Sequence, residues 1–197
     1  HAFQSNNTKA GDIKYVDQNG DGKIDGDDRK VMGADVPYIT YGLNITGSYK
    51  NFDFSILGQG VTDINVYLDS EASQAFFNGS GVKEYMLDRW TVDNPNPNAA
   101  YPRLLASADN TQNLRQSSFW LFNAAYFRVK SLSVGYNFPE SLTTKINVQG
   151  IRVYASSNNP FTIRGDKRMK DFDPETASAR GSYPQLKTFS LGLNVSL

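Results

Sequence analysis

The sequence lacks the residues on which several kinds of site depend. It has no cysteine in 197 residues, which excludes disulfide bridges, cysteine-ligated zinc and cysteine catalysis. Its single histidine is His1, so the chain offers no Ser-His-Asp triad and no set of histidine metal ligands. It also contains no phosphate-binding loop and no dinucleotide fingerprint. From these absences we expect that the protein is not an enzyme.

An excess of charge of one sign is also missing. The 20 basic and 20 acidic residues give a formal net charge of zero, and the mean hydropathy is −0.49. This balance provides no electrostatic footprint for nucleic acid, so no nucleic-acid partner is expected. No apolar run approaches the roughly 20 residues that a membrane helix needs. Strands of a transmembrane barrel are only half apolar, however, so mean hydropathy does not test for them.

Aromatic and small polar residues are abundant, with 11 Tyr, 12 Phe and 16 Gly. They alternate most clearly in residues 184–197, where the side chains of successive residues in a strand point to opposite faces. The apolar face would carry Phe189, Leu191, Leu193 and Val195, and the polar face would carry Thr188, Ser190 and Asn194. In an outer-membrane barrel the apolar face contacts lipid and the polar face lines the lumen. We expect this arrangement, and we expect Arg152 on the polar face, lining the lumen or paired with an acidic neighbour.

The same pattern divides the chain into strands and connections. It predicts a barrel hairpin over 38–62, barrel strands within 119–160 joined by a short periplasmic turn near 138–148, and a final barrel strand over 184–197. Long extracellular loops are expected over 1–37, 63–118 and 161–183, with a few short helices in 63–118. Successive connections of antiparallel strands lie at opposite ends, so the long loops would share one end, as in bacterial outer-membrane barrels. About five strands cannot close a barrel, so we expect the C-terminal piece of a larger protein.

Two details of the pattern allow alternative interpretations. Between Phe127 and Lys130 the parity of apolar residues changes, which indicates either a bulge near Lys130 or an end that projects beyond the apolar band. Trp90 and Trp120 each lie beside a long loop, where they would either anchor that loop or stack on a sugar ring. We favour anchoring.

Residues 17–28, with the sequence DQNGDGKIDGDD, fit a calcium-binding loop of the EF-hand type. The expected ligands, at positions one, three, five, seven, nine and twelve, are Asp17, Asn19, Asp21, the carbonyl of Lys23, Asp25 and Asp28. Gly22 permits the sharp turn that folds these oxygens around one hard cation. Position twelve is Asp rather than Glu, and the alternative is a turn that tolerates left-handed backbone. We expect a structural calcium ion that ties down a surface loop.

Taken in order, several segments of the chain resemble the C-terminal part of the SusC/RagA family, the TonB-linked outer-membrane transporters of Bacteroidetes. These segments are GDIKYVDQNGDGKID, YITYGLNITGSYKNFDFSILGQG, RWTVDNPNPNAAYPRL, FWLFNAAYFRVKSLSVGYNFP, VQGIRVYASSNNPFTI and YPQLKTFSLGLNVSL. The resemblance implies an all-β fold, namely the last antiparallel strands of a 22-stranded transmembrane barrel closed by a plug. It also implies import of oligosaccharides or peptides with a SusD-like surface lipoprotein, energised by the TonB complex through an N-terminal part outside this sequence. The chain ends on Leu197, whereas such barrels usually close on an aromatic residue.

A second interpretation is a secreted, calcium-stabilised β-sandwich that serves in binding or adhesion. The apolar strand faces would then form a core, and the chain would fold alone in water. The two interpretations differ in what covers the apolar face.

Overall fold

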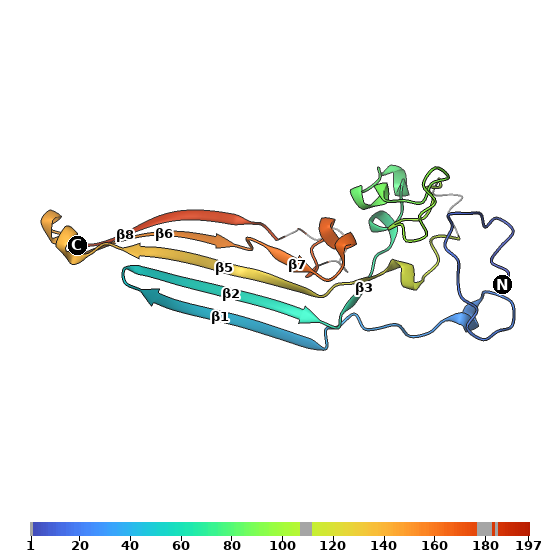
Figure 1. The fold of residues 1–197 in the computed structure, drawn as a ribbon, viewed down its shortest axis with the longest axis horizontal. Coiled ribbons are helices and arrows are strands. Elements are labelled where there is room, and N and C mark those ends of the chain that lie inside the picture. Colours follow the sequence, from blue (N-terminus) through green and yellow to red (C-terminus); the bar gives the residue numbers. More distant parts are fainter. Residues whose placement is uncertain (1, 107–111, 177–182, 184) are drawn as a thin grey trace.

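The computed structural model describes residues 2–106, 112–176, 183 and 185–197. Its main feature is a six-stranded antiparallel sheet, in which five long strands follow one another across the sheet (Figure 1). In that order they are β1 (Ile39–Tyr49), β2 (Phe52–Thr62), β5 (Tyr126–Asn137), β6 (Gly150–Asn158) and β8 (Thr188–Ser196). The short strand β7 (Thr162–Arg164) pairs with the start of β5. β1 and β8 are the two edges of the sheet.

The strand register aligns the alternating pattern across the sheet. One row of cross-strand partners consists of Tyr49, Phe52, Tyr136, Val153 and Leu193. A row on the opposite face consists of Thr46, Ser55, Ser133, Ser156 and Ser190. A shift of one residue in any strand would move its apolar side chains to the wrong face, so the pattern specifies the register. The sheet therefore has one apolar and one polar face, as the sequence predicts.

A β-bulge at Lys130 explains the change of parity in β5. Leu57 pairs with Ser131, whereas the next residue, Gly58, pairs with Val129, so Lys130 has no partner in β2. The extra residue returns the two apolar residues upstream, Phe127 and Val129, to the apolar face. The ring of Phe127 stacks there on Tyr41, with 6.1 Å between the ring centroids. The bulge interpretation of this segment is thus confirmed.

The connections differ in length between the two ends of the sheet (Figure 1). At one end Lys50 and Asn51 join β1 to β2, and Lys50 takes the left-handed conformation with φ of 54°. At that end β5 continues through α1 (Glu140–Thr143) and the 3₁₀ helix η7 (Thr144–Ile146) into β6. The segments that precede β1 and connect β2 to β5 and β6 to β8 lie at the other end. Among the described residues, no helix is both long enough and apolar enough to cross a membrane.

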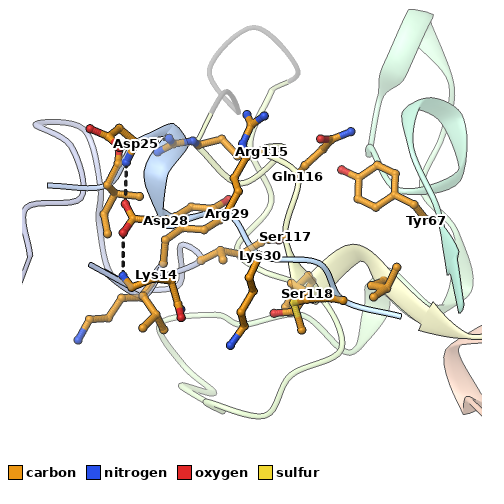
Figure 2. Close-up of a pocket in the computed structure, with 18 of the residues that line it drawn as sticks. Lys14, Asp25, Asp28, Arg29, Lys30, Tyr67, Arg115, Gln116, Ser117 and Ser118 are labelled. Atoms are coloured by element: carbon orange, nitrogen blue, oxygen red, sulfur yellow. Dashed lines mark hydrogen bonds between the residues drawn. The ribbon is translucent and has the colours of Figure 1, made fainter. Parts of the chain in front are cut away.

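The segment before β1 packs against the β2–β5 connection. Arg103 Nε lies 2.6 Å from Asp12 Oδ1, and Trp90 covers Gly11, whose φ of 87° and close ring contact both require glycine. Farther along, this segment forms the 3₁₀ helix η1 (Gly26–Asp28). Figure 2 shows that part of it lines a cleft whose other side includes Tyr67 and Gln116.

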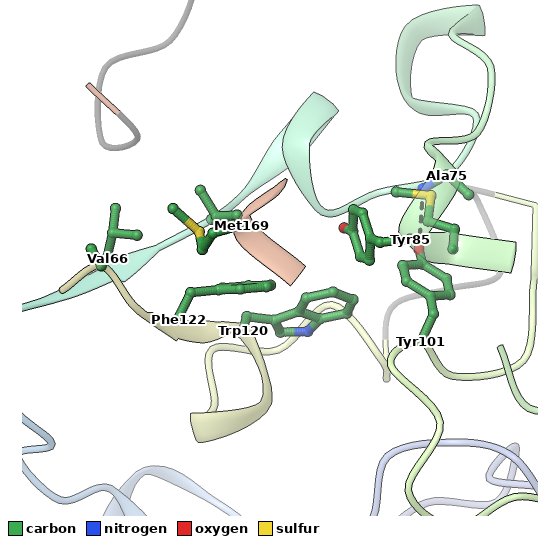
Figure 3. Close-up of a cluster of buried hydrophobic side chains, with 10 residues drawn as sticks. Val66, Ala75, Tyr85, Tyr101, Trp120, Phe122 and Met169 are labelled. Carbon is green, nitrogen blue, oxygen red and sulfur yellow. Dashed lines mark hydrogen bonds between the residues drawn. The ribbon is translucent and has the colours of Figure 1, made fainter. Parts of the chain in front are cut away.

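The long connections share one hydrophobic core at their end of the sheet, which we call the loop core (Figure 3). Their elements are β3 (Asn65–Tyr67), β4 (Leu121–Asn123) and the 3₁₀ helices η2 (Ser70–Ala72), η3 (Phe77–Gly79), η4 (Glu84–Leu87), η6 (Ser118–Trp120) and η8 (Lys167–Asp171). Met169 of η8 packs beside Phe122 and Trp120, so the β6–β8 connection completes a core begun by the β2–β5 connection. Trp120 is buried, and its Nε1 donates to the carbonyl of Asn113 at 2.6 Å. Trp120 therefore anchors its loop.

The described strands form the large sheet and one small ribbon, in which β3 pairs with β4. The ribbon belongs to the loop core and does not cover the apolar face of the large sheet. Apolar side chains on that face stay exposed, among them Leu43, Phe54, Val134 and Leu191. The described residues therefore do not form a β-sandwich, which would bury this face under a second sheet.

Candidate functional site

The last strand presents its two sets of side chains on opposite faces of the sheet. Phe189, Leu191, Leu193 and Val195 lie on the apolar face, where between 49% and 86% of each residue's surface is exposed. Thr188, Ser190 and Asn194 lie on the polar face, in rows with Asn158, Ser156 and Arg152 of β6. Because β8 is an edge strand, one side of its backbone is also unpaired among the described residues.

An ion pair lies on the polar face, close to the end of the sheet where Lys50 and Asn51 join β1 to β2. Arg152 of β6 reaches over β5 to Asp53 of β2, with its Nε 2.9 Å from Asp53 Oδ2. It passes over Gly135, where a Cβ atom would lie within 2.4 Å of the guanidinium group. Asn137 also donates to Asp53, at 3.0 Å. Arg152 thus lies on the polar face, as predicted from the sequence, and it has the acidic partner that the sequence left open.

A second, buried charge network lies at the other end of the polar face. Arg128 of β5 is 2% exposed, and its Nη2 lies 2.7 Å from Asp173 Oδ1. Its Nε donates to Thr162 Oγ1 at 2.8 Å, and its Nη1 lies 3.2 Å from Glu175 Oε1. Lys130, the bulge residue, also contacts Glu175 Oε1, at 2.6 Å. This network, which the sequence analysis missed, holds the β6–β8 connection against β5.

Electrostatics favours the ionised form of Asp173 within this network. Burial raises the pKa of the Asp173 carboxyl, but the hydrogen bond from Arg128 and those from the backbone amides of Glu175 and Gln185 outweigh it. The pKa of Asp173 is consequently lowered below its ordinary value. The carboxylate can therefore stay charged while it is nearly enclosed.

The residues of the predicted calcium loop bind backbone amides of the same loop. Asp17 accepts from the amides of Gly20 and Gly22 at 2.6 and 2.9 Å. Asp28 accepts from the amides of Gln18 and Asp25 at 2.7 and 2.8 Å, which closes the loop. These two hydrogen bonds, from Asp25 and then Gln18, lower the pKa of Asp28.

The side chains of Asn19, Asp21 and Asp25 likewise each accept a hydrogen bond from the backbone amide two residues later, those of Asp21, Lys23 and Asp27. Gly20 and Gly22 both have positive φ, 81° and 84°, as the turn interpretation requires. Over the described residues, no three acidic or histidine side chains converge on one point where a metal ion could be held. Calcium binding by Asp17, Asn19, Asp21, Lys23, Asp25 and Asp28 stays a prediction.

A cleft of about 850 Å³ lies between this loop and the loop core (Figure 2). The charged residues that line it are five basic residues, Lys14, Arg29, Lys30, Arg115 and Arg168, and two acidic residues, Asp25 and Asp28. Tyr15, Tyr67 and Phe119 contribute aromatic rings. The burial of Tyr15 raises the pKa of its hydroxyl to about 12, and that hydroxyl donates to the carbonyl of Gln112 at 2.6 Å.

Comparison with known proteins gives a consistent set of relatives, although no family model matches the chain. The chain is 32% identical over 200 residues to TonB-dependent receptor P26 of Formosa agariphila, and the alignment covers 94% of this chain and 20% of that receptor. It is 30% identical over 185 residues to TonB-dependent receptor SusC of Bacteroides thetaiotaomicron, and this alignment covers 92% of the chain and 17% of SusC. The chain thus spans about a fifth of the length of the curated relatives it matches.

Solved structures agree at the level of the fold. The structure of the RagAB peptide importer in the "open-open" state matches with a TM-score of 0.61 and 24% sequence identity, over 93% of this chain and 20% of the matched chain. A further RagAB peptide transporter structure matches with a TM-score of 0.61 and 22% identity, over 84% of this chain and 18% of that one. The antiparallel sheet is therefore part of the wall of an outer-membrane β-barrel. Together with the two-faced sheet, these relatives show that the chain belongs to the SusC/RagA family of TonB-dependent receptors.

Proposed function

We propose that the protein containing this chain imports oligosaccharides or peptides across the outer membrane through a plugged β-barrel. The observation that carries the proposal is the sheet, in which five long strands keep one exposed apolar face and one polar face in register. Lipid around a barrel would cover the apolar face, and a water-filled lumen would solvate the polar face. Neighbouring strands of the barrel would complete the open edges of β1 and β8.

In this proposal the two ends of the sheet lie on opposite sides of the membrane. The turn at Lys50–Asn51 and the connection near 138–148 would be periplasmic, and the segments 1–37, 63–118 and 161–183 would be extracellular loops. The difference in connection length between the two ends supports this orientation. Thr188, Ser190, Asn194 and Arg152 would then line the lumen.

The names of the relatives support the proposed partners and energy source. TonB-dependent receptors are named for the TonB complex, which we propose acts on this protein through a plug outside the present chain. By analogy with SusC and RagAB, we propose that a SusD-like surface lipoprotein binds at the extracellular end. RagAB is described as a peptide importer, which supports peptides as one of the two cargo classes.

Deletion of the full-length gene tests the import function. We expect the deletion strain to stop accumulating at least one member of a panel of labelled oligosaccharides and peptides, and the wild-type gene to restore accumulation. A strain without TonB should show the same defect. If the deletion strain accumulates every compound at the wild-type rate, the proposed import function is wrong.

A further inference from the structure

We infer that the cleft between the predicted calcium loop and the loop core binds an oligosaccharide that carries carboxylate or sulfate groups. The inference deepens the proposed import function, on which it rests for the role of the ligand as cargo. The cleft, of about 850 Å³, is within the size range of small-ligand sites. Its charged lining contains five basic residues against two acidic ones, although the whole chain is neutral.

Three of the cations form no ion pair in the part of the chain that the structure describes. Arg29 and Lys30 follow η1 and are exposed, and no ion pair involves either of them among those residues. Arg115 contacts neutral groups: its Nη2 lies 3.4 Å from the carbonyl of Ile24, and its guanidinium lies 5.2 Å from the centre of the Tyr15 ring. By contrast, Arg168 pairs with Asp166 at 2.8 Å, so we assign it no ligand.

The two carboxylates of the lining form no ion pair with these cations among the described residues, although the charge of Arg115 is the smallest of the causes that lower the pKa of Asp28. Both oxygens of Asp28 accept backbone amides, and Asp25 Oδ1 accepts the amide of Asp27 at 3.0 Å. Asp28 is therefore held by its own loop through both oxygens, and Asp25 through one. An anionic group entering the cleft would meet the unpaired charges of Arg29, Lys30 and Arg115, and an Arg side chain can hold a carboxylate or sulfate through two hydrogen bonds.

The remaining lining favours a sugar over a peptide. Tyr67 and Phe119 offer ring faces, and Gln116 and Ser118 offer an amide and a hydroxyl to sugar hydroxyl groups. Extended peptides are commonly bound by addition to a free strand edge. The walls of this cleft consist mainly of loop and 3₁₀ turn, with only three-residue strands at β3 and β4. An acidic oligosaccharide therefore fits both the charge and the shape of the lining.

Calorimetric titration of the purified full-length protein in detergent tests this inference. The probes are a galacturonic acid trisaccharide, a sulfated galactose oligosaccharide, neutral maltotriose and hexaglutamate. We expect at least one acidic sugar to bind, and K30Q/R115Q to weaken that binding by about tenfold or more, because each lost charged hydrogen bond costs at least 1 kcal/mol. Binding should also weaken as salt is raised.

The control variant, K9Q/K187Q, removes two exposed lysines that neither line the cleft nor belong to the predicted calcium loop. It should change the affinity less than about twofold, since screened surface charges contribute little. R115K keeps the positive charge but loses the paired N–H geometry of arginine, so it should lose some affinity but less than K30Q/R115Q. A smaller loss in R115K would show that the effect of the double variant follows charge and does not come from misfolding. Equal losses in K30Q/R115Q and K9Q/K187Q, or no binding of either acidic sugar to the wild type, would overturn the inference.

Two other outcomes separate the possible explanations. Cleft-dependent binding of hexaglutamate without binding of either acidic sugar would overturn the sugar assignment in favour of an acidic peptide. The calorimetric titration measures binding without relying on uptake. If an acidic sugar binds but the deletion strain takes up every compound normally, the import proposal is wrong and the binding site in the cleft is still supported. Absent binding with intact TonB-dependent uptake counts against the cleft alone.

Discussion

Arg152 lies 99 residues from Asp53 in the sequence, yet the strand register brings the two side chains together across β5. Alternation alone places Arg152 on the polar face, because its neighbours Ile151 and Val153 are apolar. The partner could not be predicted, since it depends on which strands are adjacent and in what register. The same distinction applies to Trp120, whose burial required knowledge of Met169 and Phe122.

The facing of Leu193 can be tested by introducing a charge. Leu193 lies on the apolar face and is 61% exposed, so L193R would place a guanidinium in lipid. We expect a cost of about 2–4 kcal/mol if the residue is near the bilayer midplane, measured as unfolding free energy of the full-length protein in lipid vesicles. S190R, on the polar face, should cost much less. Equal stability of L193R and wild type would refute the assignment of faces.

The calcium prediction concerns Asp17, which accepts two backbone amides and would also be the first ligand. We expect the full-length wild type to bind calcium, and the D17A variant to lose that binding while the strands remain assembled. Calcium titration monitored by calorimetry measures the first effect, and protease sensitivity of residues 1–37 measures the loosening of the loop. Absence of binding to the wild type would show that the loop is only an Asx-rich turn.

At the scale of elements, the local pattern of apolar and polar residues predicts the long strands, but it does not predict which distant segments pack together. The five long strands and the hairpin of β1 and β2 follow from the order of apolar and polar residues over a few positions, and the same order left a bulge near Lys130 as one of two alternatives. The short strands β3 and β7 lie in segments predicted as loops. The shared loop core was not predicted, because segments 63–118 and 161–183 have no sustained periodicity. The network of Arg128 with Asp173 was missed for a similar reason, as 45 residues separate its members.

The Arg128–Asp173 pair predicts a pH dependence of the β6–β8 connection. Because the pKa of Asp173 is lowered in the folded protein, its contribution to stability is complete above the unfolded-state pKa of about 4. It is lost as the pH falls from there through the lowered folded pKa. Protection of the described residues 161–176 against hydrogen exchange, taken relative to the intrinsic exchange rate at each pH, should therefore fall below about pH 4 in the full-length protein.

Two variants separate the charge of Asp173 from its packing. D173N should already show low protection at pH 7 and no further loss of protection below pH 4, because removal of one member of a buried pair costs about 3–5 kcal/mol. E84Q removes an exposed ion pair with Lys170 and should have little effect. If D173N exchanges like the wild type at pH 7, the network does not hold the connection.

At the scale of the whole molecule, the described sheet leaves too much unsatisfied to be stable in water alone. Its apolar face is exposed along five strands, and its two edge strands have unpaired backbone groups. The cluster of buried hydrophobic side chains found among the described residues is the loop core, which lies at one end of the sheet. We therefore expect the fold to depend on lipid at the apolar face and on pairing of the two edge strands with further strands.

Expression of residues 1–197 alone without detergent tests this dependence. We expect an insoluble or unfolded product, because strands with open edges and an apolar face associate. Circular dichroism and gel filtration of the soluble fraction provide the measurement. A soluble, cooperatively unfolding monomer would contradict the account and would place the apolar face in a core.

The most direct test of the central claim, that the sheet is barrel wall with lipid on one face, is a scan of β8 by spin labelling. This chain has no cysteine, so single cysteines can be placed from Thr188 to Ser196 without competing labels within it, and any cysteine elsewhere in the full-length protein is first replaced. The labelled protein is then studied in bilayers. The account predicts that labels at Phe189, Leu191, Leu193 and Val195 are relaxed mainly by oxygen, which partitions into lipid. Labels at Ser190, Gly192 and Asn194 should be relaxed mainly by a water-soluble nickel complex, giving a period of two residues. Uniform relaxation along the strand, or the opposite alternation, would contradict the claim.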